Sequence, residues 1–412
     1  MLANLWMGFK IAVGGANLFF MLIGVFWGII AGALPGITGS IGMALLLPFT
    51  FGMHPSTALM TLAGVYIGAM YGSSITAILI RTPGAPASAA TVLDGYELHK
   101  QGKSGKALGI SLICGTIGGL ISVILLVVMV VPLSRISLAF GPAEYFALTL
   151  FGLTIISSLS GRNVVKGIIS AILGLVVAMA GIDPFTGHPR FTFGRAELLG
   201  GVDIIAAMIG LFAISEVFIQ AREKTTWEKI DVSRVSTEFP TWQELKGLMP
   251  LTFFSGLLGT IVGVMPGAGG SIAGFIAYNE AKRWSKHPEL FGKGSYEGVC
   301  APETANNAVT GGAIVPLLAF GIPGSNAAAV LLGAILLHGL IPGPLLFQRN
   351  PDVVYSLFAG MFIANFMMLA LGYIAIKPSI YAVNVPKPVL LATILALVSV
   401  GCFSINNLTF EV

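Results

Sequence analysis

Charged side chains are scarce in this sequence. Lys and Arg number 22 and Asp and Glu 18, so 10% of the 412 residues are charged, whereas soluble domains average about 25%. Hydrophobic residues make up 55% of the chain and the mean hydropathy is +0.90, which leaves too little polar surface to cover a soluble globule. The same figures exclude an intrinsically disordered chain. The composition predicts an all-α integral membrane protein with many spans.

Cysteines and basic clusters are also sparse. Cys114, Cys300 and Cys402 lie far apart in apolar sequence, so neither a disulfide framework nor a metal site is indicated. The net charge of +4 is dispersed over short loops without interleaved aromatics, which argues against a nucleic-acid partner. Lys10 precedes a long apolar run that has no small-residue cleavage site. This run is therefore predicted to be the first membrane segment and not a removed signal peptide.

Enzyme motifs are mostly missing as well. Gly102-Lys-Ser104 resembles the end of a P-loop, but position 97 is Glu where the motif needs Gly. The five histidines are scattered singly, and neither H-E-x-x-H nor G-x-S-x-G occurs. We therefore predict no catalytic residue, metal or cofactor, and expect any transport to draw on an ion gradient.

Long apolar runs are abundant. A bilayer core of about 30 Å needs about 20 apolar residues per helix, and by that measure about 12 spans are predicted. Two further apolar stretches, 83–93 and 323–339, follow Pro-Gly pairs and are too broken or too short to be simple spans. The predicted spans cover 18–34, 37–52, 57–80, 107–131, 142–159, 167–182, 202–219, 247–264, 268–284, 302–320, 351–376 and 387–403.

One segment differs sharply from the rest in composition. Residues 220–246 carry ten charged residues in 27, which predicts a solvated cytoplasmic linker. It would separate a first membrane repeat, 1–219, from a second, 247–412. Counterparts of the last two spans of the first repeat are missing after Val412, so the second repeat is expected to be incomplete.

The two halves repeat each other in sequence. Residues 28–43 read GIIAGALPGITGSIGM and residues 259–274 read GTIVGVMPGAGGSIAG, with eight of sixteen positions identical at an offset of 231. At an offset of 240, Gly72-x10-Pro83-Gly84 matches Gly312-x10-Pro323-Gly324. Internal duplication of this kind is typical of secondary transporters.

Loop charge predicts that the two repeats are inverted. Cytoplasmic loops are enriched in Lys and Arg. Residues 94–106 hold three lysines while their counterpart 334–346 holds none, and 51–56 holds no basic residue while 282–293 holds four. The bias thus changes sides between the repeats. With an external N-terminus, the inside loops collect 16 basic residues and the outside segments five.

The Pro-Gly pairs predict interrupted helices or re-entrant hairpins. Broken backbone inside a bilayer is tolerated only where it is buried in protein or lines a cavity. A half-helix that begins there presents free N–H groups and a partial positive charge, which suits a carboxylate or, through carbonyl oxygens, a cation. The alternative is close helix packing, which is the better interpretation of the GxxxG runs at 24–32 and 259–267. The candidate substrate-binding residues are Gly36, Thr38, Gly39, Ser40, Ser73, Ser74, Pro83, Gly84, Gly267, Gly270, Ser271, Gly324, Ser325 and Asn326.

Glu303 is the acidic residue nearest the interior of a predicted span. Carboxylates inside membranes are costly and are functional candidates. Alternatively, Pro302 could start a helix at the interface, where Glu303 would interact with the helix dipole in water. Asn306 and Asn307 lie three and four residues further on, so both amides could share the acid's face. These three residues are predicted to couple transport to Na⁺ or H⁺.

Two other charged sites receive simpler interpretations. Arg81 is predicted to be a helix-end arginine whose charged head reaches the interface. Asp94, Glu97 and His99 are assigned to a solvated loop.

Several motifs together resemble the large membrane subunit of tripartite tricarboxylate transporters, from about residue 18 to the end. The motifs are Gly32-Ala-Leu-Pro-Gly-Ile-Thr-Gly-Ser40, Tyr71-Gly-Ser-Ser74, Arg81-Thr-Pro-Gly-Ala-Pro86, Asp94-Gly-Tyr96, Pro302-Glu-Thr-Ala-Asn-Asn307 and Gly321-Ile-Pro-Gly-Ser325.

This resemblance implies uptake of a tricarboxylate such as citrate, or a related organic anion, across the bacterial inner membrane. It implies a periplasmic substrate-binding protein and a small four-helix membrane subunit as partners, with Na⁺ or H⁺ as the coupling ion. Family members continue for one or two further helical hairpins, consistent with the missing spans. The alternatives are a single-component secondary carboxylate or ion transporter, a channel or structural subunit, and an intramembrane enzyme.

Overall fold

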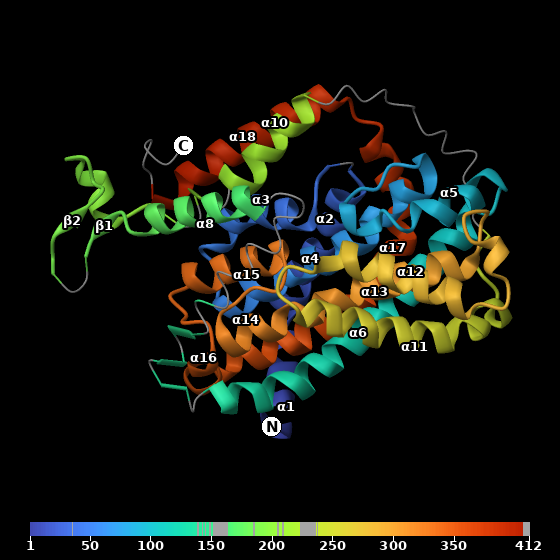
Figure 1. The fold of residues 1–412 in the computed structure, drawn as a ribbon, viewed down its shortest axis with the longest axis horizontal. Coiled ribbons are helices and arrows are strands. Elements are labelled where there is room, and N and C mark those ends of the chain that lie inside the picture. The colour runs from blue at the N-terminus through green and yellow to red at the C-terminus, as the bar shows by residue number, and fades with distance from the viewer. Residues whose placement is uncertain are drawn as a thin grey trace.

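A computed structural model of the chain shows an almost entirely helical protein, in which long helices lie roughly parallel in a packed body (Figure 1). The structure describes residues 1–34, 36–137, 140–141, 143–144, 146–147, 150, 164–183, 186–203, 206–207, 210–222, 236 and 238–406.

The elements up to residue 222 include one short β-hairpin and, at η3, one turn of π-helix. They are α1 (Leu2–Ala12), α2 (Gly15–Ala33), α3 (Gly39–Thr50), α4 (Pro55–Ile80), η1 (Pro86–Ser88), α5 (Val92–Lys100), α6 (Ser104–Ser137), α8 (Val164–Ala178), β1 (Gly181–Ile182), β2 (Pro189–Arg190), η2 (Ala196–Gly200), η3 (Gly210–Ile214) and α10 (Ser215–Arg222).

The elements after residue 240 are all helical. They are α11 (Trp242–Val264), α12 (Gly269–Trp284), η5 (Pro288–Leu290), α13 (Tyr296–Gly312), α14 (Ile314–Phe320), α15 (Asn326–Leu337), α16 (Pro344–Arg349), α17 (Pro351–Val383) and α18 (Lys387–Asn406).

Five of the described helices are long and apolar enough to cross a membrane: α2, α4, α6, α11 and α17. The all-α membrane class is therefore confirmed, while the count of 12 spans stays a prediction. The predicted span at 142–159 lies mostly outside the described residues. The chain also forms α1, which the span prediction did not include.

Three examples show how predicted spans differ in the structure. The span at 37–52 is the 12-residue helix α3, too short to cross a bilayer. The span at 302–320 is two helices, because α13 ends at Gly312 and α14 starts at Ile314. The span at 247–264 begins earlier, at Trp242, because Thr241 and Glu244 form a reciprocal capping box that starts α11.

Glycines bring the helices into direct backbone contact. A Cβ placed on Gly28 of α2 would lie 2.3 Å from the carbonyl oxygen of Val65 in α4, and one on Gly259 of α11 would lie 2.3 Å from that of Ala305 in α13. These positions correspond between the repeats, at offsets of 231 and 240. The packing interpretation of the GxxxG runs is confirmed, although Gly267 lies in the loop after α11.

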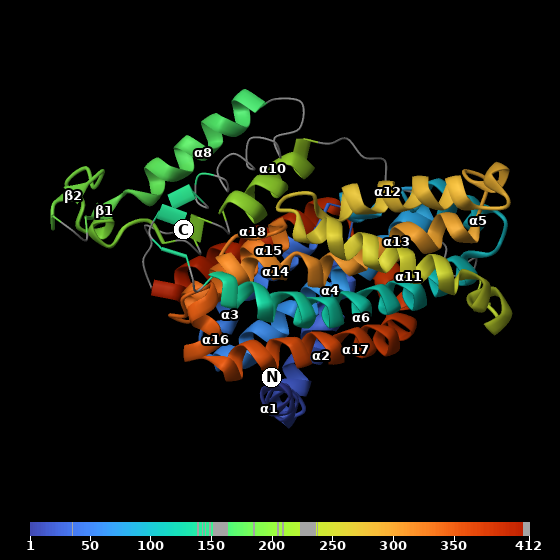
Figure 2. The same cartoon turned by 60° about the horizontal axis from the view of Figure 1, so that its bottom comes forward.

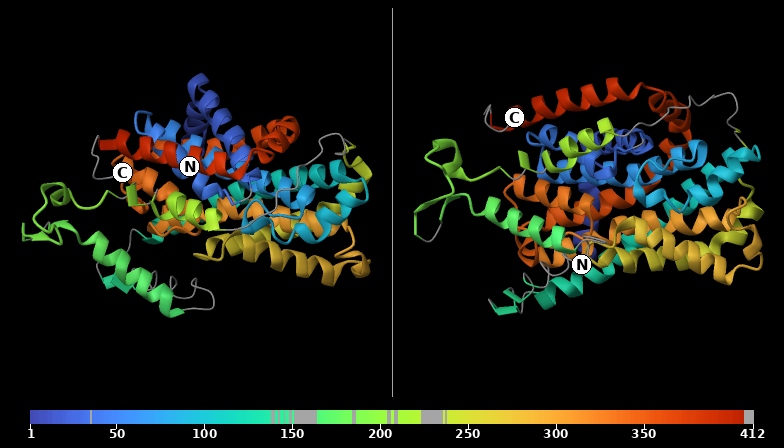
Figure 3. Two further views of the ribbon diagram at one scale, coloured as in Figure 1. Left: turned by 90° about the horizontal axis from the view of Figure 1, so that it is seen from above. Right: turned by 45° about the horizontal axis from the view of Figure 1, so that its top comes forward.

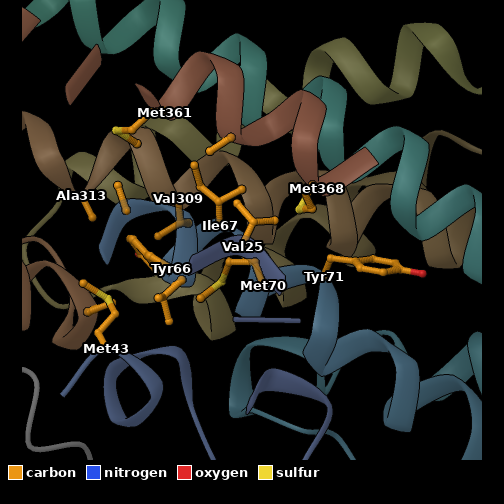
Figure 4. Packing of buried hydrophobic residues seen from close by; sticks show 14 of the residues in the cluster. Val25, Met43, Tyr66, Ile67, Met70, Tyr71, Val309, Ala313, Met361 and Met368 are labelled. Atoms are coloured by element: carbon orange, nitrogen blue, oxygen red, sulfur yellow. The ribbon is translucent and has the colours of Figure 1, made fainter. Parts of the chain in front are cut away.

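The two halves of the chain interlock. Helix α6 packs along α13, and α17 packs along α4, so each long helix from one half covers the central helix of the other (Figure 2). Figure 4 shows the resulting core, where Val25, Ile67, Val309 and Met361 from four different helices lie in one cluster. By contrast, α8 and the β1–β2 hairpin project from this body (Figure 3).

We expect Gly28→Ala to lower the thermal unfolding midpoint of the detergent-solubilised protein, since the added methyl group must push α2 away from the carbonyl oxygen of Val65. Overpacking of this kind costs about 1–3 kcal/mol. Gly15→Ala is the matched control, because Gly15 is in the same helix and a Cβ there meets no atom within 4 Å. Equal midpoints for the two variants would show that the close α2–α4 contact is unimportant for stability.

Candidate functional site

The two Pro-Gly loops of each half are joined by one backbone hydrogen bond. In the first half the Gly36 N–H donates to the carbonyl oxygen of Gly84 at 3.2 Å, and in the second the Gly267 N–H donates to that of Gly324 at 2.9 Å. Gly36 and Gly267 have φ angles of +87° and +79°, in the left-handed region that favours glycine. The same backbone hydrogen bond and the same glycine conformation thus hold the interrupted backbone in both halves.

A second bond ties each loop to the central helix of its own half. The Gly84 N–H donates to the carbonyl oxygen of Ser73, and the Gly324 N–H donates to that of Ala313, each at 3.2 Å. Ala313 stands between α13 and α14, so the second bond satisfies a carbonyl at a helix break. The duplicated sequence therefore gives duplicated hydrogen bonds.

The two central helices end in matched left-handed residues. Gly321 follows α14 with φ +75°, and its counterpart Arg81 follows α4 with φ +58°. Arg81 is exposed and its guanidinium lies 5.9 Å from the ring centre of Tyr96. The structure confirms Arg81 as a helix-end residue.

Two predicted site hydroxyls act as helix caps. The Thr38 side chain accepts from the Ile41 N–H at the start of α3, and the Ser325 side chain accepts from the Ala328 N–H at the start of α15. At the start of α12, by contrast, the N-cap residue Ala268 makes no side-chain capping hydrogen bond.

Ser73 and Ser74 are buried in α4 and bonded to hydroxyls of other elements. Ser73 Oγ lies 2.5 Å from Ser88 Oγ in η1, and Ser74 Oγ lies 2.7 Å from Ser111 Oγ in α6. Each also donates to a carbonyl oxygen of its own helix. These serines form a polar layer beside Glu303.

The remaining predicted residues lie around the loops with differing exposure. Gly39 and Ser40 are buried in the first turn of α3, Pro83 and Ser271 are half-buried, and Asn326 is exposed as the first residue of α15.

Glu303 is fully buried in the interior of α13, seven residues after the helix begins at Tyr296. Thr91 Oγ1 donates to its Oε1, and Ser111 Oγ donates to its Oε2 at 3.1 Å. In the part of the chain that the structure describes, no Lys, Arg or His forms an ion pair with it. The alternative of an interfacial cap is wrong, because Pro302 also lies inside the helix and not in its first turn.

Asn306 and Asn307 are buried, but they face different neighbours. Asn307 Nδ2 donates to the backbone carbonyl of Glu303 at 2.9 Å and lies beside Gly115 of α6. Asn306 faces Gly270 of α12, and neither of its amide atoms has a hydrogen-bond partner among the described residues. Glu303 and Asn307 both meet α6, at Ser111 and Gly115, whereas Asn306 meets α12, so only one of the two amides shares this neighbour with the acid.

Asp94 was assigned to a solvated loop, and the structure corrects this. Asp94 is fully buried in α5, and its Oδ1 accepts the N–H groups of Gly292, Gly294 and Ser295 at 2.8, 2.9 and 2.8 Å. Its Oδ2 accepts the hydroxyl of Tyr278 at 2.8 Å. This carboxylate fastens the first half of the chain to the α12–α13 connection of the second. The sequence signal that could have identified this role is the place of Asp94 in the Asp94-Gly-Tyr96 motif.

Two of the cysteines that are distant in sequence meet in space. Cys114 of α6 and Cys300 of α13 are buried free thiols on two helices that pack together. Thr252 Oγ1 lies 3.3 Å from Cys300 Sγ. Both cysteines belong to the α6–α13 contact that also buries Glu303.

Comparison with protein families gives one match that covers nearly the whole chain. Residues 18–412 match the model of the tripartite tricarboxylate transporter TctA family. The chain belongs to the TctA family. It is thus a membrane transporter of the tricarboxylate type.

Two similar proteins come from Agrobacterium vitis. One, named "Uncharacterized 52.8 kDa protein in TAR-I ttuC' 3'region", is 36% identical over 412 residues, which cover 100% of this chain and 82% of the relative. The other, named "Uncharacterized protein in TAR-II ttuC' 3'region", is 38% identical over 154 residues, 37% of this chain and 64% of that relative. No solved structure matches the chain.

Proposed function

We propose that this TctA-family protein takes up tricarboxylates or related organic anions through the bacterial inner membrane, driven by a Na⁺ or H⁺ gradient. The observation that carries the proposal is Glu303, a fully buried carboxylate that receives two hydroxyl donors and has no cationic partner among the described residues. A buried carboxylate is costly while it is charged. A proton or a Na⁺ ion would remove that cost, so cation occupancy and the packing of this site are linked.

The position of Glu303 supports a role in a moving part of the protein. Its carboxylate is contributed by α13, while the hydroxyls come from Thr91 and Ser111 of the other half. A change in cation occupancy therefore acts on the contact between the two halves. In transporters built from repeats, alternating access arises from movement of one repeat against the other.

The complete transporter would contain two partners and inverted repeats. We propose a periplasmic substrate-binding protein that delivers the anion and a small four-helix membrane subunit. Residues 1–219 and 247–412 would form inverted repeats of about 12 spans in all, with the cytoplasmic linker 220–246 between them. The substrate would bind around the interrupted helices at the Pro-Gly loops.

Uptake into proteoliposomes tests this function. The protein is reconstituted with its small subunit, and accumulation of labelled citrate is measured with and without the binding protein, under Na⁺ and pH gradients imposed separately. We expect accumulation that requires one gradient and the binding protein. Accumulation without the binding protein would favour a single-component transporter, and indifference to both gradients would rule out ion coupling.

The inverted topology predicts which surface residues an impermeant reagent can reach. Lys103, Lys286 and Arg195 are exposed, so labelling of a cysteine placed there depends on the side of the membrane. In intact cells we expect cysteines at positions 103 and 286 to be protected from an external maleimide and a cysteine at 195 to react. Labelling at 103 or 286 from outside would contradict the inverted arrangement. Permeabilised cells, in which all three should react, provide the control.

A further inference from the structure

The start of α12 is an uncapped helix N-terminus that faces an unpartnered amide. Helix α12 is 16 residues long, and its N-cap residue, Ala268, makes no side-chain capping hydrogen bond. Asn306 is fully buried, and its Oδ1 lies 2.3 Å from the position that a Cβ on Gly270 would take. Neither amide atom of Asn306 has a hydrogen-bond partner among the described residues. Free N–H groups and a partial positive charge at a helix start attract anions.

Small residues let the first turns of α12 pack directly against two other elements. A Cβ on Gly270 would lie 2.9 Å from the Cβ of Ala87 in η1, and one on Gly274 would lie 3.3 Å from the carbonyl oxygen of Ala87 and 3.7 Å from Pro302 of α13. Ala87 belongs to the first half of the chain, whereas Asn306 and α12 belong to the second. The helix start therefore lies where the halves meet.

The corresponding helix start in the first half is capped. At the offset of 231, Gly269 of α12 corresponds to Thr38, whose hydroxyl accepts the Ile41 N–H of α3. Gly269 has no side chain to do this and takes φ +62°. The Thr38 hydroxyl thus satisfies one backbone N–H group at the start of α3, and Gly269 cannot do the same for α12.

The central helices α13 and α4 also differ in whether the corresponding polar side chain has a hydrogen-bond partner. At the offset of 240, Asn306 corresponds to Tyr66, whose hydroxyl lies 3.0 Å from the Oγ of Ser325. One turn further along the half-helices, α3 has the fully buried Met43 where α12 has Gly274. In the first half, therefore, the Tyr66 hydroxyl is paired and the buried Met43 side chain is part of α3.

We propose that the start of α12, and not that of α3, binds a carboxylate group of the transported anion. The N–H groups of Gly270 and Ser271 and the Nδ2 of Asn306 would donate to it. The two ends of an amide side chain are assigned from the surrounding hydrogen bonds, so Asn306 can present Nδ2 where Oδ1 is now placed. This rests on the proposed function, and it assigns Asn306 to the anion and not to the coupling cation.

The assignment also gives a physical route for coupling. Glu303 and Asn306 are three residues apart on α13, about one helical turn. A cation at Glu303 and a carboxylate at Asn306 would attract each other across this distance in a poorly screened interior. Each ligand would therefore favour binding of the other.

The deciding experiment is Asn306→Asp, which puts a negative charge of similar shape beside the bound carboxylate. Binding of radiolabelled citrate, succinate and acetate to the purified complex is measured at equilibrium, together with the KM for uptake and its Na⁺ dependence. We expect the Kd of the preferred carboxylate to rise about 100-fold or more, because facing like charges cost several kcal/mol. Tyr66→Phe, the matched change in the first half, should leave Kd unchanged.

A second variant keeps the test informative if Asn306→Asp does not fold. Gly270→Ala puts a methyl group against the side chain of Asn306 and should also weaken carboxylate binding. Gly247→Ala should not, because a Cβ there meets no atom within 4 Å. Unchanged binding in folded Asn306→Asp or Gly270→Ala protein would overturn the proposal, as would a raised Na⁺ affinity in Asn306→Asp with normal carboxylate binding. Wild-type protein that neither binds nor transports any of the three acids would overturn the proposed function as well.

Discussion

Replacing Glu303 with Gln is expected to abolish gradient-driven accumulation of substrate while the protein still folds and inserts. The substitution keeps the size of the side chain and one acceptor oxygen for Thr91 or Ser111, but it removes the group that can take up a proton or balance the charge of Na⁺. Initial uptake rate and final accumulation are measured in the same proteoliposomes. Downhill exchange of substrate should persist, because the anion site proposed at the start of α12 does not include this carboxylate.

Glu297→Gln is the matched control for this prediction. Glu297 is in the first turn of the same helix, where it accepts a hydrogen bond from Ser285 and is not buried. It should accumulate substrate as the wild type does. Normal accumulation by Glu303→Gln under the same gradient would show that this buried carboxylate has a structural role only.

Replacing Asp94 with Ala is expected to prevent recovery of folded protein. The substitution removes the acceptor of three backbone N–H groups and of the Tyr278 hydroxyl at once. The bonds from Ser295 N–H and the Tyr278 hydroxyl are buried, and each buried donor left without a partner costs about 1–3 kcal/mol. Together they are a large part of the total stability of a typical protein, about 5–15 kcal/mol. The yield of monodisperse protein in detergent and its thermal midpoint are the measurements. Asp94→Asn, which retains one acceptor oxygen, should be less severe.

Glu97→Ala provides the control on the same helix. Glu97 pairs with Lys100 at 2.6 Å on the surface, and exposed pairs of this kind contribute about 0–1 kcal/mol. Its midpoint should stay close to that of the wild type. A stable Asp94→Ala protein would mean that the α12–α13 connection is held by other contacts.

Together these residues indicate that the most consequential chemistry lies between the two halves of the chain. Glu303 is bonded by two residues of the first half, Asp94 is bonded by residues of the second, and Asn306 and Ala87, one from each half, both lie beside Gly270. A transporter that alternates between two states needs contacts that differ between those states. The boundary between the halves is where such contacts would act.

The sequence by itself determined the membrane class, the duplication and the interrupted helices. These properties are local: scarce charge and long apolar runs require a lipid environment, and glycine or proline at a given position limits the backbone whatever surrounds it. The repeated Pro-Gly pairs therefore predicted the paired loops at Gly36 and Gly267 correctly. The motif containing Glu303 marked a functional candidate for the same reason, because few carboxylates occur in apolar sequence.

Only the tertiary structure decided the surroundings of those residues. Asp94 reads as solvated because Glu97, His99 and Lys100 follow it closely, yet its partners lie about 200 residues away in sequence. Asn306 and Asn307 are adjacent in sequence, but a helix turns about 100° per residue, so each faces a different neighbour. Burial and hydrogen-bond partners depend on which helices pack together, and interlocked repeats bring those helices from opposite halves of the chain.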